Sequence, residues 1–266
     1  RVQYREFDFR VLRTEHFDVY FYPEIEDAAR IAARLAERWY ARLSRLLGHE
    51  LRGRQPLILY ASHPDFEQTN ALASAPGEGT GGVTEVFKRR IVLPFAGPLA
   101  ETDHVLGHEL VHAFQFDITG DRGPVGAGRL PTALGLPLWF IEGMAEYLSL
   151  GPVDPQTAMW MRDAATRELP PLAKLDDPRY FPYRYGHALW AYVGGRWGDS
   201  AVAAVLRASA RGTDWRRAIE ETLGVSVDSL SREWHAALRA AYAPLRDRTA
   251  PPDRFARAVV PARRGQ

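Results

Sequence analysis

Two histidines and a glutamate stand at a spacing that allows metal chemistry. Residues 108–112 read HELVH, which places His108 and His112 four positions apart with Glu109 directly after the first. On an α-helix this spacing puts both imidazoles on one face, one turn apart, where their ring nitrogens can meet one cation. Imidazole suits Zn²⁺, and a carboxylate beside the ion can take a proton from water. The pattern predicts a site for one Zn²⁺ on His108 and His112, with Glu109 as general base.

A catalytic zinc site needs a third protein ligand and leaves a fourth position open. Residues 139–147 read WFIEGMAEY and carry Glu142 and Glu146 one turn apart on a mostly apolar segment. Carboxylates on a buried helix face are costly unless they are paired or bound to a metal. His104 stands one turn before His108, but one ion cannot contact three turns of a straight helix. We therefore interpret His104 either as an outer contact or substrate-rim residue, or as an ordinary half-buried histidine.

The composition limits the kind of site that the chain can build. The 266 residues include no cysteine, which excludes disulfides, thiolate zinc sites, iron–sulfur clusters and a cysteine nucleophile. Any zinc must then be held by histidine and carboxylate, which favours a catalytic site over a structural one. The formal net charge of +1 gives no overall field that would attract nucleic acid. No apolar run approaches the roughly 18–20 residues of a membrane span.

The elements that must position these residues change in character along the chain. Strand composition is found at residues 17–22, 56–61, 83–87 and 90–94, and apolar residues at helical spacing predict a helix over 24–47. From residue 97 the pattern is helical almost throughout. The predicted helices cover residues 99–118, 137–150, 157–168, 185–197, 200–211, 215–223 and 226–242, and residues 62–82 and 119–137 are predicted loops.

These elements predict an α+β fold in a single domain. A small mixed β-sheet forms an N-terminal α/β lobe over about residues 1–96, and a mainly helical lobe follows over about 97–245, with the active-site cleft between them. Residues 246–266 are rich in Arg and Pro and read as a solvated tail or a linker to a further, C-terminal domain. The sequence opens at Arg1 without Met or an apolar leader, so we expect either a removed signal segment or a piece of a longer chain.

The two helix motifs GHELVHAFQ and WFIEGMAEY together resemble those of gluzincin metallopeptidases such as thermolysin and aminopeptidase N, and most of all bacterial peptidase MA-like domains. The resemblance implies a zincin-like fold, Glu142 as the third ligand and Glu146 as a residue that orients a histidine. The reverse assignment of the two glutamates stays open. Weaker similarity extends over most of residues 5–245. The 29 residues between His112 and Glu142 exceed the family spacing, and we expect the surplus to reshape the cleft rim.

Two further segments resemble parts of aminopeptidase-type gluzincins. Residues 183–186, YRYG, are similar to a Y-x-K-G segment, which implies that Tyr183 donates to the oxyanion and that Tyr185 replaces the lysine. The alternative is that both tyrosines are core or rim aromatics. Residues 82–85, GVTE, are similar to a strand that grips a free amino terminus, which makes Glu85 a candidate for that role. An edge strand there could also pair with an extended substrate. His187 and His235 are expected to be structural.

The predicted function is a zinc-dependent metallopeptidase that acts on peptide or protein substrates through a metal-activated water, with Glu109 as general base. The resemblance also implies an exported protein. Two alternatives remain at this point: a catalytically silent zinc-binding or scaffold module of a larger exported protein, and a zinc hydrolase that acts on non-peptide amides or esters.

Overall fold

The computed structural model describes residues 5–70, 80–95, 97–120, 131–212, 214–250, 254–257 and 259. The fold is α+β, with a small mixed sheet and many helices, as the sequence predicts. None of the helices in the described ranges is both long enough and apolar enough to cross a membrane. Residues 71–79 and 121–130 of the two predicted loops, and residues 251–253, 258 and 260–266 of the predicted tail, lie outside the described residues.

Five strands in the described part of the chain form one sheet with the order β1-β2-β3-β5-β4. The strands are β1 (Arg10–Arg13), β2 (Phe17–Phe21), β3 (Gln55–Tyr60), β4 (Val83–Glu85) and β5 (Arg90–Pro94). The inner strands β2, β3 and β5 are parallel, and β1 and β4 pair with them in antiparallel orientation at the two edges. Strand β1 is absent from the sequence prediction because it has only four residues, RVLR, which are mostly exposed at a sheet edge.

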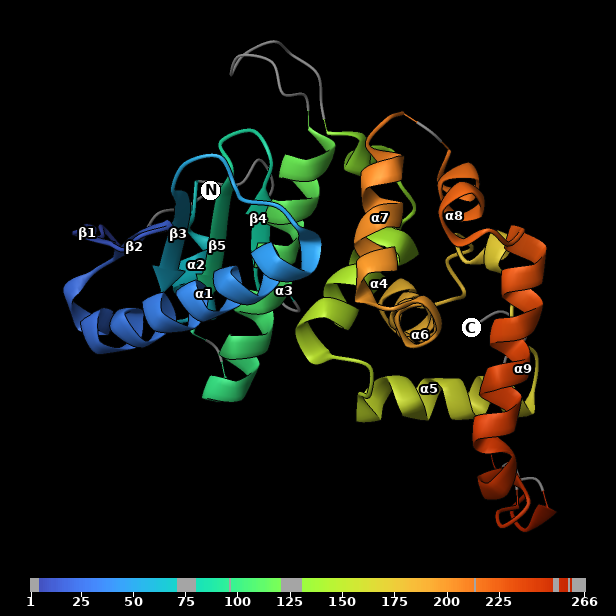
Figure 1. Ribbon diagram of the computed structural model, residues 1–266. Coiled ribbons are helices and arrows are strands. Elements are labelled where there is room, and N and C mark those ends of the chain that lie inside the picture. The colour runs from blue at the N-terminus through green and yellow to red at the C-terminus, as the bar shows by residue number, and fades with distance from the viewer. Residues whose placement is uncertain are drawn as a thin grey trace.

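The helices follow in an order close to the predicted one (Figure 1). They are α1 (Glu26–Leu47), α2 (His63–Glu67), α3 (Leu99–Thr119), α4 (Leu138–Leu150), α5 (Pro155–Thr166), α6 (Pro182–Trp197), α7 (Asp199–Ser209), α8 (Trp215–Leu223) and α9 (Val227–Arg246). Three short 3-10 turns lie at η1 (Pro23–Ile25), η2 (Thr132–Gly135) and η3 (Leu172–Lys174).

Three of these elements differ from the sequence prediction. Helix α2 falls in the predicted loop, where the Ser62 side chain caps its first turn and Phe66 is buried. Helix α6 begins at Pro182, three residues earlier than predicted, because proline fits the first turn of a helix. Helix α9 continues to Arg246, through Pro244, and so enters the segment predicted as a tail.

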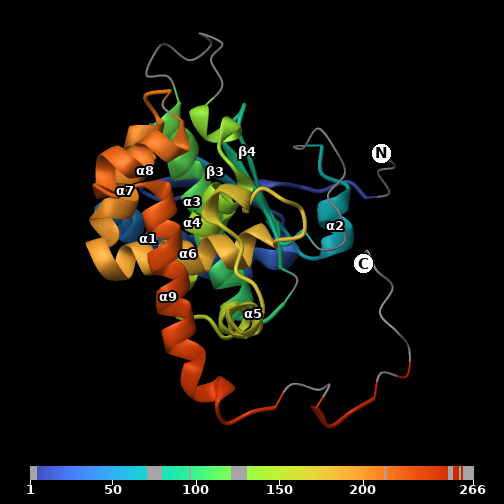
Figure 2. The ribbon, with the colours of Figure 1, turned by 90° about the vertical axis from the view of Figure 1, so that its right-hand side faces the viewer.

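Helix α3 lies between the two halves of the molecule (Figure 1). On one side it contacts α1 and the strands β4 and β5, and on the other it contacts α4, α7 and η2. Figure 2 shows α9 along the outer side of the helical half, with α5 seen end-on near its base. The HELVH motif lies in the middle of α3, so its side chains can meet groups from both halves of the molecule.

Helices α4 and α6 meet backbone to backbone at two glycines. A Cβ atom built on Gly143 would lie 2.3 Å from Cα and C of Gly186, and one built on Gly186 would lie 2.1 Å from the Trp139 carbonyl oxygen. Neither neighbour is a flexible side chain that could move aside. Glu142 directly precedes Gly143, so this close approach of the helices also brings Glu142 near Tyr183, in the first turn of α6.

We expect Gly143→Ala to lower the free energy of unfolding by about 3 kcal/mol, at the upper end of the cost of overpacking a core, because backbone must give way. Urea unfolding followed by circular dichroism measures the change. Gly195→Ala, on the exposed side of α6 with no atom within 4 Å of the added Cβ, is the matched control. The control should gain about 0.5–1 kcal/mol from the better helix former. Equal stabilities of the two variants would contradict the close contact.

Candidate metal centre

Three side chains from α3 and α4 converge on one point. The His108 Nε2 atom lies 3.1 Å from His112 Nε2 and 3.1 Å from Glu142 Oε2, and His112 Nε2 lies 3.3 Å from the same oxygen. Ligand atoms about 2.0 Å from a tetrahedral zinc ion are about 3.3 Å apart, so the three atoms have the spacing of three zinc ligands. All three side chains are largely buried. The structure thus shows a buried His–His–Glu group that could hold a metal ion.

The outer nitrogens of both histidines face acceptors. The Gln115 amide group donates to the Ile141 carbonyl oxygen over 3.0 Å, so its own oxygen faces His112 Nδ1 at 2.8 Å. His108 Nδ1 lies 3.1 Å from Glu146 Oε1. In the neutral rings the proton is therefore on Nδ1, and both Nε2 atoms present lone pairs to each other and to Glu142. Three acceptors that face one another need a cation between them.

The charges of the group support the same conclusion. Burial alone disfavours the charged form of His108, but contacts with Glu142 and Glu146 raise the pKa of His108 to about 10. Burial likewise opposes ionisation of Glu142, yet the two imidazoles hold the pKa of this carboxyl well below its usual range. The centre therefore stabilises one positive charge among these atoms, which a proton or a metal cation can supply.

Glu109 is held beside the triad by the edge strand β4. The Thr84 hydroxyl lies 2.6 Å from Glu109 Oε2 and 2.8 Å from the Glu109 backbone carbonyl oxygen. The backbone of Gly82 also lies against this side chain, since a Cβ on Gly82 would be 2.9 Å from Glu109 Cγ. Strand β4 therefore fixes the carboxylate that the sequence predicts to be the general base.

The triad opens into a cavity of about 380 Å³. An aromatic ring lies along each histidine: Tyr183 stacks on His108 at 6.0 Å between ring centres, and Phe116 stacks on His112 at 6.1 Å. Burial and the nearby Glu142 carboxylate raise the pKa of the Tyr183 hydroxyl above its ordinary value, at which a phenol is already protonated at neutral pH. The other described residues that line the cavity are Thr80, Gly82, Val83, Thr84, Glu109, Ala133, Leu134, Leu136, Leu138, Ile141 and Glu142.

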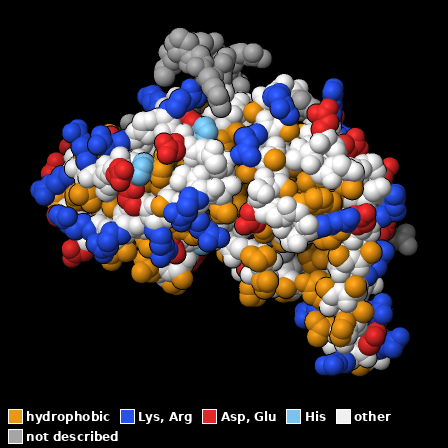
Figure 3. Space-filling model, in the orientation of Figure 1, with side chains coloured by type: hydrophobic (Ala, Val, Ile, Leu, Met, Phe, Trp, Pro, Cys, Tyr) orange, Lys and Arg blue, Asp and Glu red, His pale blue; other side chains and the backbone are white. Residues whose placement is uncertain are grey.

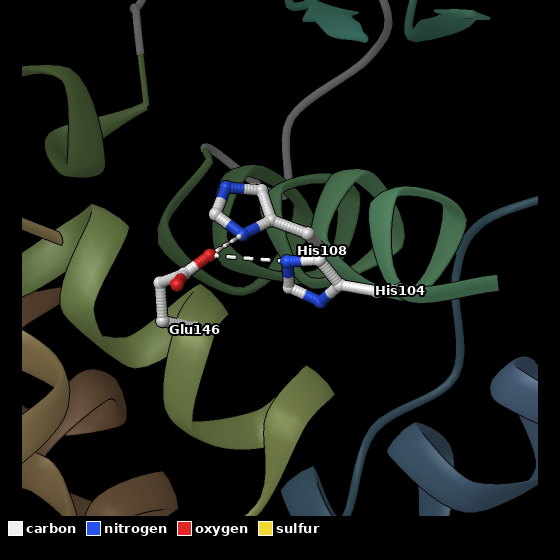
Figure 4. Close-up of side chains that lie close together, drawn as sticks. All are labelled: His104, His108 and Glu146. Carbon is white, nitrogen blue, oxygen red and sulfur yellow. Dashed lines mark ion pairs between the residues drawn. The ribbon is translucent and has the colours of Figure 1, made fainter. Parts of the chain in front are cut away.

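Glu146 lies behind His108 and does not reach His112. Figure 4 shows His104 and His108 projecting from α3 toward one oxygen of Glu146, which comes from α4; the distances are 3.4 Å to His104 Nε2 and 3.1 Å to His108 Nδ1. The other oxygen accepts a hydrogen bond of 2.7 Å from Arg184 Nη1, while Arg184 Nη2 donates to Gln156 Oε1. The structure thus brings Glu142 to both HELVH histidines and Glu146 only to His104 and His108.

The residues His104, His108 and Glu146 form a second group close enough to hold a cation. The Arg184 guanidinium already neutralises Glu146, since it lies 2.7 Å from its carboxylate in a largely buried position. A second cation on this carboxylate would be repelled by the guanidinium at close range. Contacts with His104 and His108 also hold the pKa of Glu146 well below its usual range against the effect of burial. We therefore interpret Glu146 as the ionised partner that orients His108.

We expect Arg184→Ala to weaken zinc binding by up to about tenfold, at the lower end of the effect of losing an outer partner of a metal-bound histidine, because Glu146 stays but loses the group that fixes its position. Competition with a chromogenic chelator measures the affinity. Arg184→Lys keeps the positive charge and should recover part of the loss. If both variants lowered stability but bound zinc as the unaltered chain does, Arg184 would serve packing alone.

The remaining predicted residues lie away from the triad. Glu85 is not among the described residues that line the cavity; its carboxylate accepts from the backbone N–H groups of Phe87 and Lys88 and so closes the turn after β4. Tyr185 is buried and packs edge-on against Tyr180, so it is an aromatic residue of the core, which is the alternative that the sequence left open.

Two histidines outside the centre, His187 and His235, hold structural contacts, as expected. His187 bonds Thr157 Oγ1 through Nδ1 and the Gly151 carbonyl oxygen through Nε2. His235 Nε2 lies 2.9 Å from the Pro170 carbonyl oxygen.

Three residues of the centre are missing from the sequence prediction: Thr84, Gln115 and Arg184. Gln115 stands three positions after His112, on the same helix face, and this spacing could have identified it. Arg184 lies between Tyr183 and Tyr185 in a segment that becomes buried, but its partner Glu146 is 38 positions away. Nothing in the local sequence indicates that pair, and the same holds for Thr84 and Glu109.

The sequence was also compared with known proteins. No protein-family model matches the chain, and no match is found among the curated proteins. The functional interpretation therefore depends on the residues and the geometry described above.

Proposed function

We propose that this protein is a zinc-dependent metallopeptidase. The observation that carries the proposal is the convergence of His108 Nε2, His112 Nε2 and Glu142 Oε2 at mutual distances of 3.1–3.3 Å, in a cavity that also contains Glu109. Two neutral imidazoles and one carboxylate leave a zinc ion with net positive charge and an open position. This is the donor set of catalytic zinc, and the likeness of the two helix motifs to those of gluzincins supports the same function.

Each residue of the centre has a role in peptide hydrolysis. His108, His112 and Glu142 would hold the zinc ion, which when bound supplies Lewis-acid activation of water and of the scissile carbonyl. Glu109 takes the proton from the attacking water and returns it to the leaving amine. Thr84 keeps the Glu109 carboxylate oriented for both transfers. The Tyr183 hydroxyl, which lines the cavity beside His108, donates to the oxyanion of the tetrahedral intermediate.

The cavity supports a zincin-like arrangement for the substrate. Strand β4 is the edge strand and carries Val83 and Thr84 on the cavity wall, while α3 forms the floor. An extended peptide could add to this edge through backbone hydrogen bonds and so place one peptide bond over the triad. Residues 133–138, within the long connection between His112 and Glu142, supply Ala133, Leu134, Leu136 and Leu138 on the opposite wall.

The proposal is tested by metal analysis combined with cleavage of a peptide library. The purified protein should bind one zinc ion per chain, cut peptides in the library, lose this activity with a chelator and regain it with zinc. Zinc binding without any cleavage would favour a catalytically silent zinc-binding or scaffold module. Cleavage of esters or non-peptide amides alone would favour a zinc hydrolase of such compounds. A chain that binds no zinc would refute all three.

A further inference from the structure

A series of aromatic rings leads from the metal centre to the surface of the helical half. Tyr183 stacks on His108, Phe181 lies 5.3 Å from Tyr183 between ring centres, and Trp160 lies 5.6 Å from Phe181. Phe181 is the residue before α6, and Trp160 comes from α5, so two elements contribute to the series. Trp160 and Phe181 are each 40% exposed. We call Trp160, Phe181 and Tyr183 the aromatic shelf.

Tyr183 of the shelf stacks on His108, and Phe116 of the cavity lining stacks on His112, so aromatic rings lie against both HELVH histidines. His104, His108, His112 and Phe116 follow one another at four-residue intervals along α3, so they mark a line on its surface. Phe116 stacks on His112 at one end of this line, while Tyr183 stacks on His108 nearer the other. A peptide that runs across the triad along this line would therefore meet apolar surface before and after the bond to be cut.

The shelf has the properties of a binding surface for a bulky apolar side chain. Partly exposed aromatic rings offer a large contact area, and rings already held by one another lose little conformational freedom on binding. The neighbouring charge, Arg184, is directed inward and paired with Glu146 and Gln156. It is not placed to bind the charged terminus of a peptide. Hydrophobic side chains are also visible on the surface around α5 and α9 (Figure 3).

We infer that the aromatic shelf is a substrate subsite for an aromatic or large aliphatic side chain, on the His108 side of the cleaved bond. The inference rests on the proposed peptidase function and extends it. With apolar surfaces on both sides of the triad, the substrate is an extended peptide cut at an internal bond. The position of Glu85, which closes the turn after β4, agrees with this mode because its carboxylate is already bonded to backbone N–H groups.

The test uses peptides with both ends blocked and a single Phe moved along an otherwise small and polar sequence. Their dissociation constants are measured by calorimetry on the zinc-loaded Glu109→Gln variant, which is expected to bind without cutting. We expect Phe to strengthen binding at two positions, one on each side of the bond. Adding Trp160→Ala and Phe181→Ala should weaken binding by about tenfold for the peptide with Phe on one side only.

Phe255→Ala is the matched control, since Phe255 is an exposed aromatic residue outside the shelf, and it should change no dissociation constant. As separate variants, Trp160→Phe should bind the affected peptide nearly as tightly as the parent does, whereas Trp160→Ala should bind it more weakly. If the double variant bound every peptide as its parent does, while the unaltered enzyme cut the library, the subsite would be refuted and the proposed function would stand. If the parent bound no peptide and the unaltered enzyme cut none, both would fall.

Discussion

Glu109→Gln is expected to abolish measurable peptide hydrolysis while the zinc ion stays bound. The amide cannot take a proton from water, and loss of general-base catalysis costs about 10²- to 10⁴-fold in rate. The new side chain has nearly the same shape, and its amide oxygen can still accept from the Thr84 hydroxyl, which lies 2.6 Å from Glu109 Oε2. The variant should therefore fold and bind metal as the unaltered chain does. Hydrolysis of a peptide identified in the library screen measures the change.

Zinc content and urea unfolding of the same preparation are the controls for this experiment. Both should be unchanged, because Glu109 makes none of the short contacts between His108, His112 and Glu142. A variant that cut the peptide at the normal rate would disprove the assignment of Glu109 as general base. A variant that also lost zinc would show that Glu109 supports the metal as well as the proton transfer.

Glu142→Ala should remove zinc from the protein under conditions in which the unaltered chain is saturated. The substitution deletes one of three ligands and leaves two imidazoles on one helix, which cannot complete a catalytic site. We expect the affinity to fall by more than the roughly 10–100-fold that loss of an outer partner costs. Titration of the metal-free protein with zinc, followed by competition with a chelator, gives both constants.

Glu146→Ala is the matched comparison, since the two glutamates lie one turn apart on α4. It should lower zinc affinity by about 10–100-fold, because His108 loses the carboxylate at its Nδ1 atom. It should also lower the stability of the protein, since the buried Arg184 guanidinium loses its closest carboxylate and keeps, among the described residues, only Asp154 at 3.4 Å. The reverse result, full affinity in Glu142→Ala and none in Glu146→Ala, would make Glu146 the ligand.

The part of the centre that depends on helix periodicity was predictable from the sequence. His108 and His112 meet because four residues make about one helical turn. The second apolar helix, with two acidic positions, offered Glu142 and Glu146 as candidates, and the choice of Glu142 came from the resemblance to gluzincins. The helices around them were also clear, since their apolar spacing is regular over many residues. The small mixed sheet followed from short β-branched and aromatic segments, and the structure confirms it.

The remainder depends on contacts between distant segments. Thr84 and Glu109 are 25 positions apart, and Arg184 and Glu146 are 38 positions apart. Such pairs are decided by packing of the whole domain, which a single sequence does not reveal. Strand β1 and helix α2 were missed for a different reason. They are short and gain their stability from a neighbouring strand or from a capping side chain, not from their own apolar pattern.

The contact between Gly143 and Gly186 also limits how the site can vary among related sequences. Gly143 stands next to the third candidate ligand, Glu142, and Gly186 stands about one turn after Tyr183. Because the two glycines touch, a side chain added at either position would separate the two helices. Such a substitution would move Glu142 away from Tyr183 and would also lower the free energy of unfolding. Selection for metal binding and selection for folding therefore act on the same contact, and homologues that bind metal through this site should keep glycine at both positions.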